Sequence, residues 1–296
     1  MSDRPFVDRP VDDLAAARSV AVSAAHDWGL AEPELLRRGM NAIFATGDVV
    51  LRVGRPSVPA AVSIDLARHL LAAGILVPQP VGAAVLERDG LAVTAWQRIE
   101  AIEVPVDWSG VGSMVRAVHD HDPAAVPSGY PTPSPASFPW WDFDAMLADV
   151  ATDIDRPALQ GLVAAVERHR GWADFDRTAL CHGDVHPGNV MMSSDGPVLL
   201  DWDLMCIAPP AWDHAPLLTL AERWGGDHGV YEAFADGYGM SFRDEPIAEG
   251  YAELRLVAAT LMRVRAGRTD AHAHAEAERR LAFWRGEPDA PVWAAQ

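Results

Sequence analysis

The chain has 296 residues, 49% of them hydrophobic, which is enough to bury the core of one large domain or of two modest ones. All 24 residues of the Lys and Arg class are arginines, so a lysine Schiff base and a lysine-containing phosphate loop are excluded. The formal net charge of −18 argues against nucleic acid as a partner.

The acidic excess lies after residue 98, because residues 1–98 carry a net charge of −1 and residues 99–296 carry −17. Such a surface would steer a cationic small molecule, although an acidic composition also serves solubility alone. The chain has only two cysteines, and it has charges in place of a signal peptide's apolar core. Its apolar uncharged stretch over 70–86 is broken by glycine and prolines and is too short to span a membrane. We therefore expect a cytoplasmic protein that binds no membrane.

The first 95 residues predict a small antiparallel sheet. Apolar residues at three- and four-residue spacing indicate a helix over 12–28. Three β-like runs follow, with Thr46-Gly47-Asp48 as a hairpin turn, then a crossing helix that Gly74 ends, and two more strands. The predicted strands cover 35–40, 42–46, 49–53, 81–86 and 91–96, and the crossing helix covers 59–73.

After about residue 100 the pattern is mostly helical. The exception is a short hairpin, with strands over 190–192 and 198–200, and the proline-rich stretch 123–139 predicts a loop. The expected helices cover 109–121, 143–154, 157–170, 212–224, 229–238, 246–266 and 271–284. We therefore expect two lobes, residues 1–98 and residues 99–296.

One segment carries recognisable chemistry. His182, Asp184 and Asn189 have the spacing H-x-D-x-x-x-x-N of a kinase catalytic loop, and Asp201 follows the predicted hairpin. From a loop, Asp184 would orient a phosphoryl-accepting hydroxyl and take its proton. The Asn189 amide and the Asp201 carboxylate offer the hard oxygen ligands that Mg²⁺ prefers, and the hairpin would bring them together.

The pattern H-G-D-x-H-x-x-N, followed by a hydrophobic strand and Asp-Trp, resembles the signature of the aminoglycoside phosphotransferase and choline kinase-like families. The resemblance implies an α+β, two-lobed protein-kinase-like fold, with a small antiparallel-sheet N-lobe that binds nucleotide and a larger helical C-lobe that carries the catalytic loop and binds the acceptor. It places Gly39 and Asn41 in the nucleotide-covering loop and Arg52 at the α/β-phosphates. Residues 96–99, including Trp96 and Ile99, become the hinge beside the adenine.

The resemblance also suggests supporting roles. It makes His182 a residue that holds the loop, and we interpret His186 in the same way, as a histidine bonded to backbone or to a carboxylate. Asp203 is equally compatible with a metal or substrate contact and with capping the following turn. Asp213 belongs to the family's P-x-x-D segment, and we interpret it as a helix N-cap.

Two positions depart from the family pattern. Arg52 replaces the usual lysine, and a guanidinium grips phosphate bidentately where an ammonium acts as a point charge. The next helix normally offers a glutamate to this base, but Ser63 stands there, with Asp65 two residues away. A nucleotide- or metabolite-binding pseudokinase without turnover is therefore an alternative.

The expected reaction is transfer of the γ-phosphoryl group of ATP or GTP, with Mg²⁺, to a hydroxyl of a small molecule. Candidate acceptors are aminoglycosides and other cationic antibiotics, for which the protein would confer resistance, and also choline-like amines, sugars and homoserine-like metabolites. A cationic acceptor is favoured if Asp142, Asp144 and Asp203 face the cleft, beside Trp140 and Trp141. The element Gly183–His186 also resembles that of metallophosphoesterases, a remote alternative, and the sequence indicates no oligomeric state.

Overall fold

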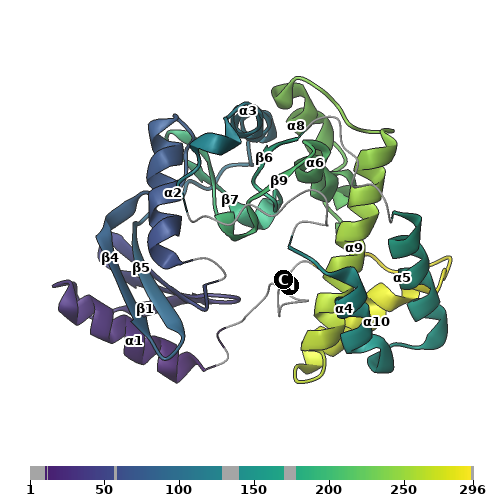
Figure 1. The fold of residues 1–296 in the computed structure, drawn as a ribbon, viewed down its shortest axis with the longest axis horizontal. Coiled ribbons are helices and arrows are strands. Elements are labelled where there is room, and N and C mark those ends of the chain that lie inside the picture. The colour runs from purple at the N-terminus through teal and green to yellow at the C-terminus, as the bar shows by residue number, and fades with distance from the viewer. Residues whose placement is uncertain (1–10, 12, 57–58, 129–139, 170–177, 295–296) are drawn as a thin grey trace.

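The computed structural model describes residues 11, 13–56, 59–128, 140–169 and 178–294 (Figure 1). The predictions for the first ten residues, for residue 12, for 129–139 of the proline-rich loop and for residue 170 lie outside the described residues. In the described part, a sheet with helix α1 (Leu14–Asp27) lies on one side and most of the helices lie on the other, with helix α2 (Ala60–Ala72) between them.

The N-terminal part is a five-stranded antiparallel sheet with the spatial order β1-β2-β3-β5-β4. The strands are β1 (Glu34–Arg38), β2 (Ala42–Thr46), β3 (Val49–Gly54), β4 (Pro80–Arg88) and β5 (Leu91–Gln97). The strands expected over 42–46, 49–53 and 91–96 match within one residue. The strand expected over 35–40 ends at Arg38, because a turn follows in which the Gly39 amide donates to the Asn41 carbonyl at 3.0 Å.

Alternation along the strands gives the sheet two different faces. Phe44 and Leu51 are fully buried in an apolar cluster with α1, which covers one face. Arg52, the neighbour of Leu51, lies opposite Thr94 in the ladder and points to the other face. The sheet therefore directs Arg52 toward the side on which α2 lies.

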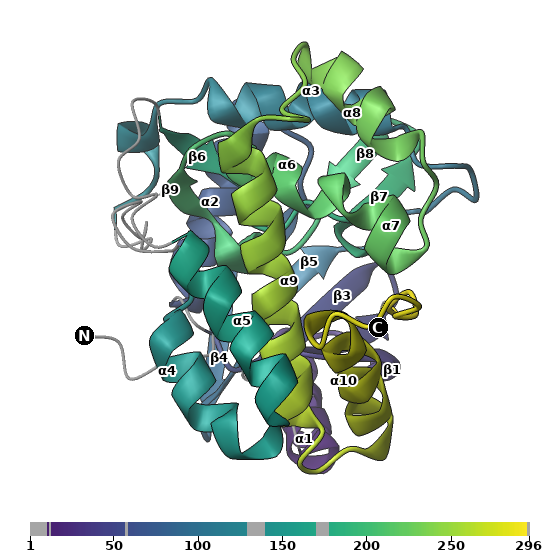
Figure 2. The ribbon, with the colours of Figure 1, turned by 90° about the vertical axis from the view of Figure 1, so that its right-hand side faces the viewer.

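The C-terminal part is built around helix α9, with α4, α5 and α10 around its lower half (Figure 2). Its apolar residues Leu254, Val257 and Leu261 are spaced by three and four positions and are buried in the largest core cluster. The helices are α3 (Trp108–His119), α4 (Phe143–Val150), α5 (Arg156–Arg168), α6 (Ala211–Leu218), α7 (Leu220–Trp224), α8 (Val230–Tyr238), α9 (Pro246–Ala266) and α10 (Ala271–Trp284). None of the helices in the described ranges is long and apolar enough to cross a membrane.

Three details of the C-terminal part differ from the prediction. The helix expected over 143–154 ends as an α-helix at Val150, and one 3-10 turn follows over Ala151–Asp153. The helix expected over 212–224 is two helices, because α6 contains Pro216 and ends before Thr219. The hairpin forms as predicted from β7 (Val190–Ser193) and β8 (Gly196–Leu199). The strands β6 (Ala179–Cys181) and β9 (Cys206–Ala208) were not predicted, because three residues are too few to show an alternating pattern.

A third apolar cluster crosses the expected lobe boundary at residue 98. Leu66 and Leu70 of α2 pack with Val118 of α3, Leu180 of β6 and Met205, and all five side chains are almost completely buried. The division at residue 98 stays a prediction, because α2 shares this cluster with the C-terminal part.

Replacing Glu253 with glutamine is expected to lower the free energy of unfolding by about 1–2 kcal/mol at pH 7. Glu253 of α9 accepts hydrogen bonds from His169 Nε2 at 2.5 Å and from Arg168 Nη2 at 2.7 Å, and its side chain is 27% exposed. The bond from His169, and then that from Arg168, lower the pKa of Glu253 to about 2. The stabilisation is therefore complete above about pH 4.5 and is lost as the pH falls toward 2.

Urea unfolding at pH 7 and pH 3 measures this difference, with the exposed Glu249→Gln on the same helix as the control. The difference between wild type and Glu253→Gln should be smaller at pH 3 than at pH 7. An equal difference at both pH values would contradict the role given to the carboxylate.

Candidate active site

Strand pairing brings together the two segments that carry the predicted site residues. β6 ends at Cys181 and β9 begins at Cys206, and these two residues lie opposite each other in the antiparallel ladder. Residues 182–189 therefore leave the ladder beside residues 200–205, which enter it. The Leu200 amide donates to the Asn189 carbonyl at 2.8 Å, so that Asn189 and Asp201 lie at the joined ends of the hairpin.

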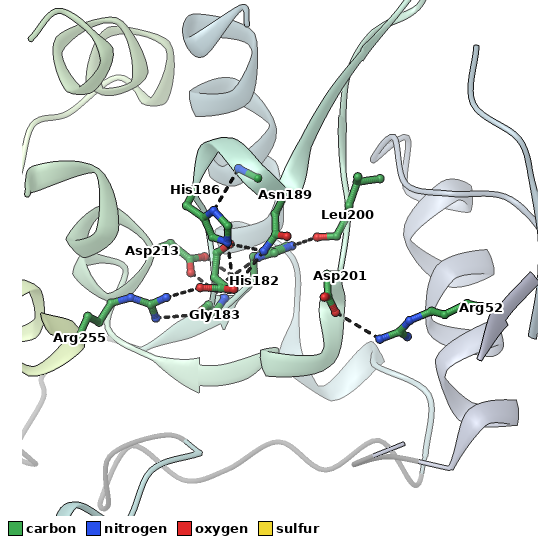
Figure 3. Close-up of polar contacts among 11 residues, drawn as sticks. Arg52, His182, Gly183, His186, Asn189, Leu200, Asp201, Asp213 and Arg255 are labelled. Atoms are coloured by element: carbon green, nitrogen blue, oxygen red, sulfur yellow. Dashed lines mark hydrogen bonds and ion pairs between the residues drawn. The ribbon is translucent and has the colours of Figure 1, made fainter. Parts of the chain in front are cut away.

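Asp184 is held by contacts to both carboxylate oxygens from Asn189, His186 and Arg255, the three partners that Figure 3 labels. The Asn189 side-chain amide donates to Asp184 Oδ2 and to its carbonyl, each at 3.0 Å, and His186 Nε2 lies 3.3 Å from Oδ2. Arg255 of α9 donates to Oδ1 and, at 2.6 Å, to the Gly183 carbonyl. Burial by itself raises the pKa of Asp184, but His186, Arg255 and His182 outweigh it and hold the pKa well below its usual range.

His182 connects the two segments from a fully buried position. Its Nε2 lies 2.9 Å from the Leu200 carbonyl, and its Nδ1 accepts from the Asp184 amide at 3.2 Å. This pattern requires the tautomer with the proton on Nε2, and burial lowers the pKa of His182, which favours the neutral ring. Gly183 has φ +90°, and a Cβ there would lie 1.9 Å from the Leu204 carbonyl oxygen, so this close approach requires glycine.

The interpretation of Asp213 as a helix N-cap was wrong. α6 begins at Ala211 without a side-chain cap, and Asp213 lies inside it, completely buried. Its carboxylate accepts from the backbone amides of His182 and Gly183, each at 2.7 Å, and lies 3.1 Å from His119 Nε2. Burial acts to raise its pKa, but the hydrogen bond from His119 and the other partners lower it, so the carboxylate stays charged. Asp213 therefore fixes the start of the 182–189 loop to the helical core.

Arg52 faces the loop after β8 from the sheet. Its guanidinium donates to both carboxylate oxygens of Asp203, with 3.2 Å from Nη1 to Oδ1, and lies 3.4 Å from Asp201 Oδ1. With its amide oxygen turned toward the guanidinium, Asn41 accepts from Nη2 at 2.8 Å and from Nε at 3.2 Å. Burial and the carboxylates of Asp203 and Asp184 raise the pKa of Asp201 to about 6, against the effect of Arg52.

Arg52 and Asp203 border a cavity between the sheet, α2 and the loop after β8, whereas the predicted catalytic and metal residues Asp184, Asn189 and Asp201 are not among its lining residues. Of the residues predicted for nucleotide binding, Asn41, Arg52 and Trp96 line it, whereas Gly39 and Ile99 do not. Gly39 lies in the exposed turn before β2, and Ile99 is half-buried after β5. The lining is completed by Gly54, Pro56, Ala60, Ser63, Ala92, Thr94 and Asp203.

Among the described residues that line this cavity, α2 contributes no carboxylate beside Arg52. Ser63 lines the cavity but has no charge. Asp65 lies 3.2 Å from Arg68 Nη1, and its side chain is 59% exposed. The carboxylates next to Arg52 come from the loop after β8 instead.

The aromatic segment before α4 does not present its acids to the cavity. Trp141 is buried against Trp212, with ring centroids 5.6 Å apart. Asp142 is exposed and caps α4 by accepting from the Ala145 amide at 3.0 Å, and Asp144 is exposed as well.

Arg255 is a site residue that the sequence prediction missed. Its guanidinium carbon lies 5.3 Å from the ring centroids of both Trp141 and Trp212, and it reaches Asp184 from 71 positions along the chain. A charged residue between the buried Leu254 and Leu256 is a signal that could have found it, because such a charge needs a partner.

Comparison with solved structures shows the same fold in small-molecule kinases. A thermostable mutant of an aminoglycoside phosphotransferase is 15% identical, with a TM-score of 0.67 over 91% of this chain and 100% of that chain. An amicoumacin kinase in complex with AMP-PNP, Ca²⁺ and Ami is 16% identical, with a TM-score of 0.65 over 95% and 96% of the two chains. A choline/ethanolamine kinase family protein from Mesorhizobium loti is 17% identical, with a TM-score of 0.63 over 92% and 93%.

The protein-kinase-like, two-part α+β architecture implied by the sequence resemblance is therefore confirmed. In addition, the model of the phosphotransferase enzyme family matches residues 42–257. This range begins at β2 and includes Arg52, the 182–189 loop, Asp201, Asp213 and Arg255. The chain belongs to the phosphotransferase enzyme family.

Proposed function

We propose that this protein transfers the γ-phosphoryl group of ATP or GTP to a hydroxyl group of a small molecule. One observation carries the proposal: Asp184 and Asn189 are hydrogen-bonded to each other at one end of a closed hairpin, and Asp201 at its other end faces Arg52 of the sheet. This arrangement brings a base, two oxygen ligands and a cation onto segments that hydrogen bonds join, and these are the parts that phosphoryl transfer needs.

In this proposal Asp184 orients the acceptor hydroxyl and takes its proton. Its low pKa keeps the carboxylate ionised, and the bonds from Asn189 and Arg255 fix its orientation. Phosphoryl transfer with a loose transition state asks mainly for positioning and charge neutralisation, so a weakly basic but well-placed carboxylate suits the reaction.

The residues present fit a Mg²⁺ ion. Asn189 uses its Nδ2 to bind Asp184, which turns its amide oxygen away from that carboxylate. This oxygen and the Asp201 carboxylate are the hard donors that Mg²⁺ prefers. When bound, the ion would neutralise charge on the nucleotide phosphates. His182 would keep both ligands in place, since it bonds the Leu200 carbonyl and the Asp184 amide.

The nucleotide would occupy the cavity on the sheet side. Arg52 would contact the phosphates, the turn with Gly39 and Asn41 would cover them, and Trp96 to Ile99 would flank the base. The amicoumacin kinase was solved with AMP-PNP, and a spectinomycin phosphotransferase with the same fold was solved with ADP. Both support a nucleotide as the co-substrate here.

A cationic antibiotic such as an aminoglycoside remains the first acceptor class to test, because spectinomycin and amicoumacin kinases share the fold and residues 99–296 are strongly acidic. A cytoplasmic enzyme that phosphorylates such an antibiotic would make the cell resistant to it. The charges near the site are more balanced than the sequence suggested. Asp142 and Asp144 are exposed, Asp203 binds Arg52, and the partly buried Arg255 pairs with Asp184. Neutral hydroxylated acceptors therefore belong in the same screen.

Asp201→Asn is expected to abolish the Mg²⁺-dependent part of nucleotide binding. Wild-type protein should unfold at a higher temperature with ATP or GTP plus Mg²⁺ than with the nucleotide alone, because ligands that bind only the folded state stabilise it. The variant should lose this increment, because an amide is a weaker ligand than a carboxylate. Asp195→Asn, in the turn of the same hairpin, removes an equal charge and should retain it.

The same samples then test turnover by ADP or GDP release with a panel of hydroxylated acceptors. Nucleotide binding without release on any acceptor would favour the pseudokinase alternative. Metallophosphoesterase chemistry gains no support from the site: within the described ranges, the group of His, Cys and acidic side chains close enough to share a metal is His119, Cys181 and Asp213, and it excludes Asp184 and His186.

A further inference from the structure

The family pattern leaves a question about Arg52 that the structure answers. A basic residue that contacts phosphates must be held in one orientation, since a long side chain otherwise loses rotamer freedom on binding. In the family pattern, a glutamate on the helix after β3 holds the basic residue, but this chain has Ser63 at that position. The acid that takes this position has to be found among the groups that face the guanidinium.

Around Arg52, α2 contributes the uncharged Ser63, β5 contributes Thr94, and the turn before β2 contributes Asn41. The carboxylates of Asp201 and Asp203 contact the guanidinium, and both residues follow β8.

The two carboxylates bind Arg52 differently. Asp203 engages both terminal nitrogens, Nη1 through Oδ1 and Nη2 through Oδ2, which is the bidentate geometry that fixes the plane of a guanidinium. Asp201 makes a single contact of 3.4 Å. Arg52 and Asp203 are also the less exposed side chains, at 24% and 33%, compared with 42% for Asp201. Asp203 is therefore the carboxylate built to hold Arg52, and Asp201 can leave it for a metal ion.

We propose that Asp203 is the positioning residue for Arg52: it supplies, from the loop after β8, the carboxylate that the kinase-like pattern places on α2, and so holds the guanidinium toward the nucleotide phosphates. The inference rests on the proposed function. It gives the departures at Arg52 and Ser63 a common explanation, because a forked guanidinium can reach an acid across the cavity and no longer needs one on the helix.

The decisive measurement is the affinity for ATP by calorimetry in the presence of EDTA, with no divalent metal. Removing a negative charge beside a polyanion should tighten ATP binding if charge alone mattered. If Asp203 positions Arg52, Asp203→Asn should instead weaken it by about tenfold to a hundredfold, the range for a hydrogen bond to a charged group. Asp203→Glu should retain most of the affinity, and Asp65→Asn on the exposed side of α2 should leave it unchanged.

The rescue variant tests the position of the carboxylate directly. Ser63 lines the same cavity as Arg52, so Ser63→Glu returns an acid to α2. In the Asp203→Asn background, this second change should raise the affinity for ATP at least tenfold, although it adds negative charge near the phosphates. Thermal unfolding of each variant without ligand verifies that it folds.

Three outcomes would overturn the inference. Unchanged or tighter ATP binding by Asp203→Asn in EDTA would show that Asp203 does not position Arg52. A loss seen only with Mg²⁺ would assign Asp203 to the metal ion instead. A loss in EDTA that neither Asp203→Glu nor Ser63→Glu relieves would show a general defect. All three leave the proposed function intact, whereas wild-type protein that bound neither ATP nor GTP would overturn both.

Discussion

Asp184→Asn is expected to lower the rate of phosphoryl transfer by about 10² to 10⁴, the usual contribution of a positioned acid–base group. The substitution removes the negative charge that would accept the proton. It also turns an NH₂ group toward one of two donors, Arg255 at Oδ1 or the Asn189 amide at Oδ2, so that one of these bonds is lost in either orientation. The effect should fall on kcat rather than on nucleotide affinity, because Arg52 and the cavity are unchanged.

Steady-state kinetics with the acceptor found in the screen measures this loss, together with nucleotide affinity by thermal shift. Asp195→Asn is again the matched control for the loss of one carboxylate. A variant that retained more than about a tenth of the wild-type kcat, while unfolding at the wild-type temperature, would remove Asp184 from the role of base.

Asp213→Ala is expected to destabilise the protein by about 3–5 kcal/mol, the cost of removing one partner from a buried charged network. The two backbone amides of His182 and Gly183 would remain buried without their acceptor, and His119 would lose a partner. Because these amides begin the 182–189 loop, activity should fall together with stability even at temperatures where the variant is folded.

Urea unfolding followed by circular dichroism gives the free energy, with Asp236→Ala on the exposed side of α8 as the control, where we expect a change within about 0.5 kcal/mol. A loss below about 1 kcal/mol for Asp213→Ala would mean that the loop amides find other partners. The three contacts of the carboxylate would then contribute little to the free energy of unfolding.

Much of the site could be predicted from the sequence because its residues are close along the chain. His182, Asp184 and Asn189 lie on one loop, and a tight hairpin must return the chain to Asp201. The periodicity of the longer helices was equally informative: α9 and α10 have the predicted bounds of 246–266 and 271–284. Features that depend on residues close along the chain, such as this loop and these helices, could therefore be predicted from the sequence.

The rest depends on contacts between distant segments, which periodicity cannot report. Arg255 meets Asp184 only because α9 packs through the centre of the helical part. Asp213 looked like a cap because it follows two prolines, whereas its partners are amides 30 and 31 positions earlier. The pairing of Arg52 with Asp203 spans 151 positions and joins the sheet to the loop after β8.

The apolar cluster around α2 limits how the molecule can open. Separating the sheet and α2 together from the helical part would expose Leu66, Leu70 and Val118, each at a cost of about 1.5–3 kcal/mol. A wide hinge motion about residue 98 is therefore expensive. We expect exchange of bound molecules to use a small shear instead, in which the sheet slides along α2 while this helix stays docked on the helical part. Its amplitude would be set by how far Arg52 can travel before it releases Asp203.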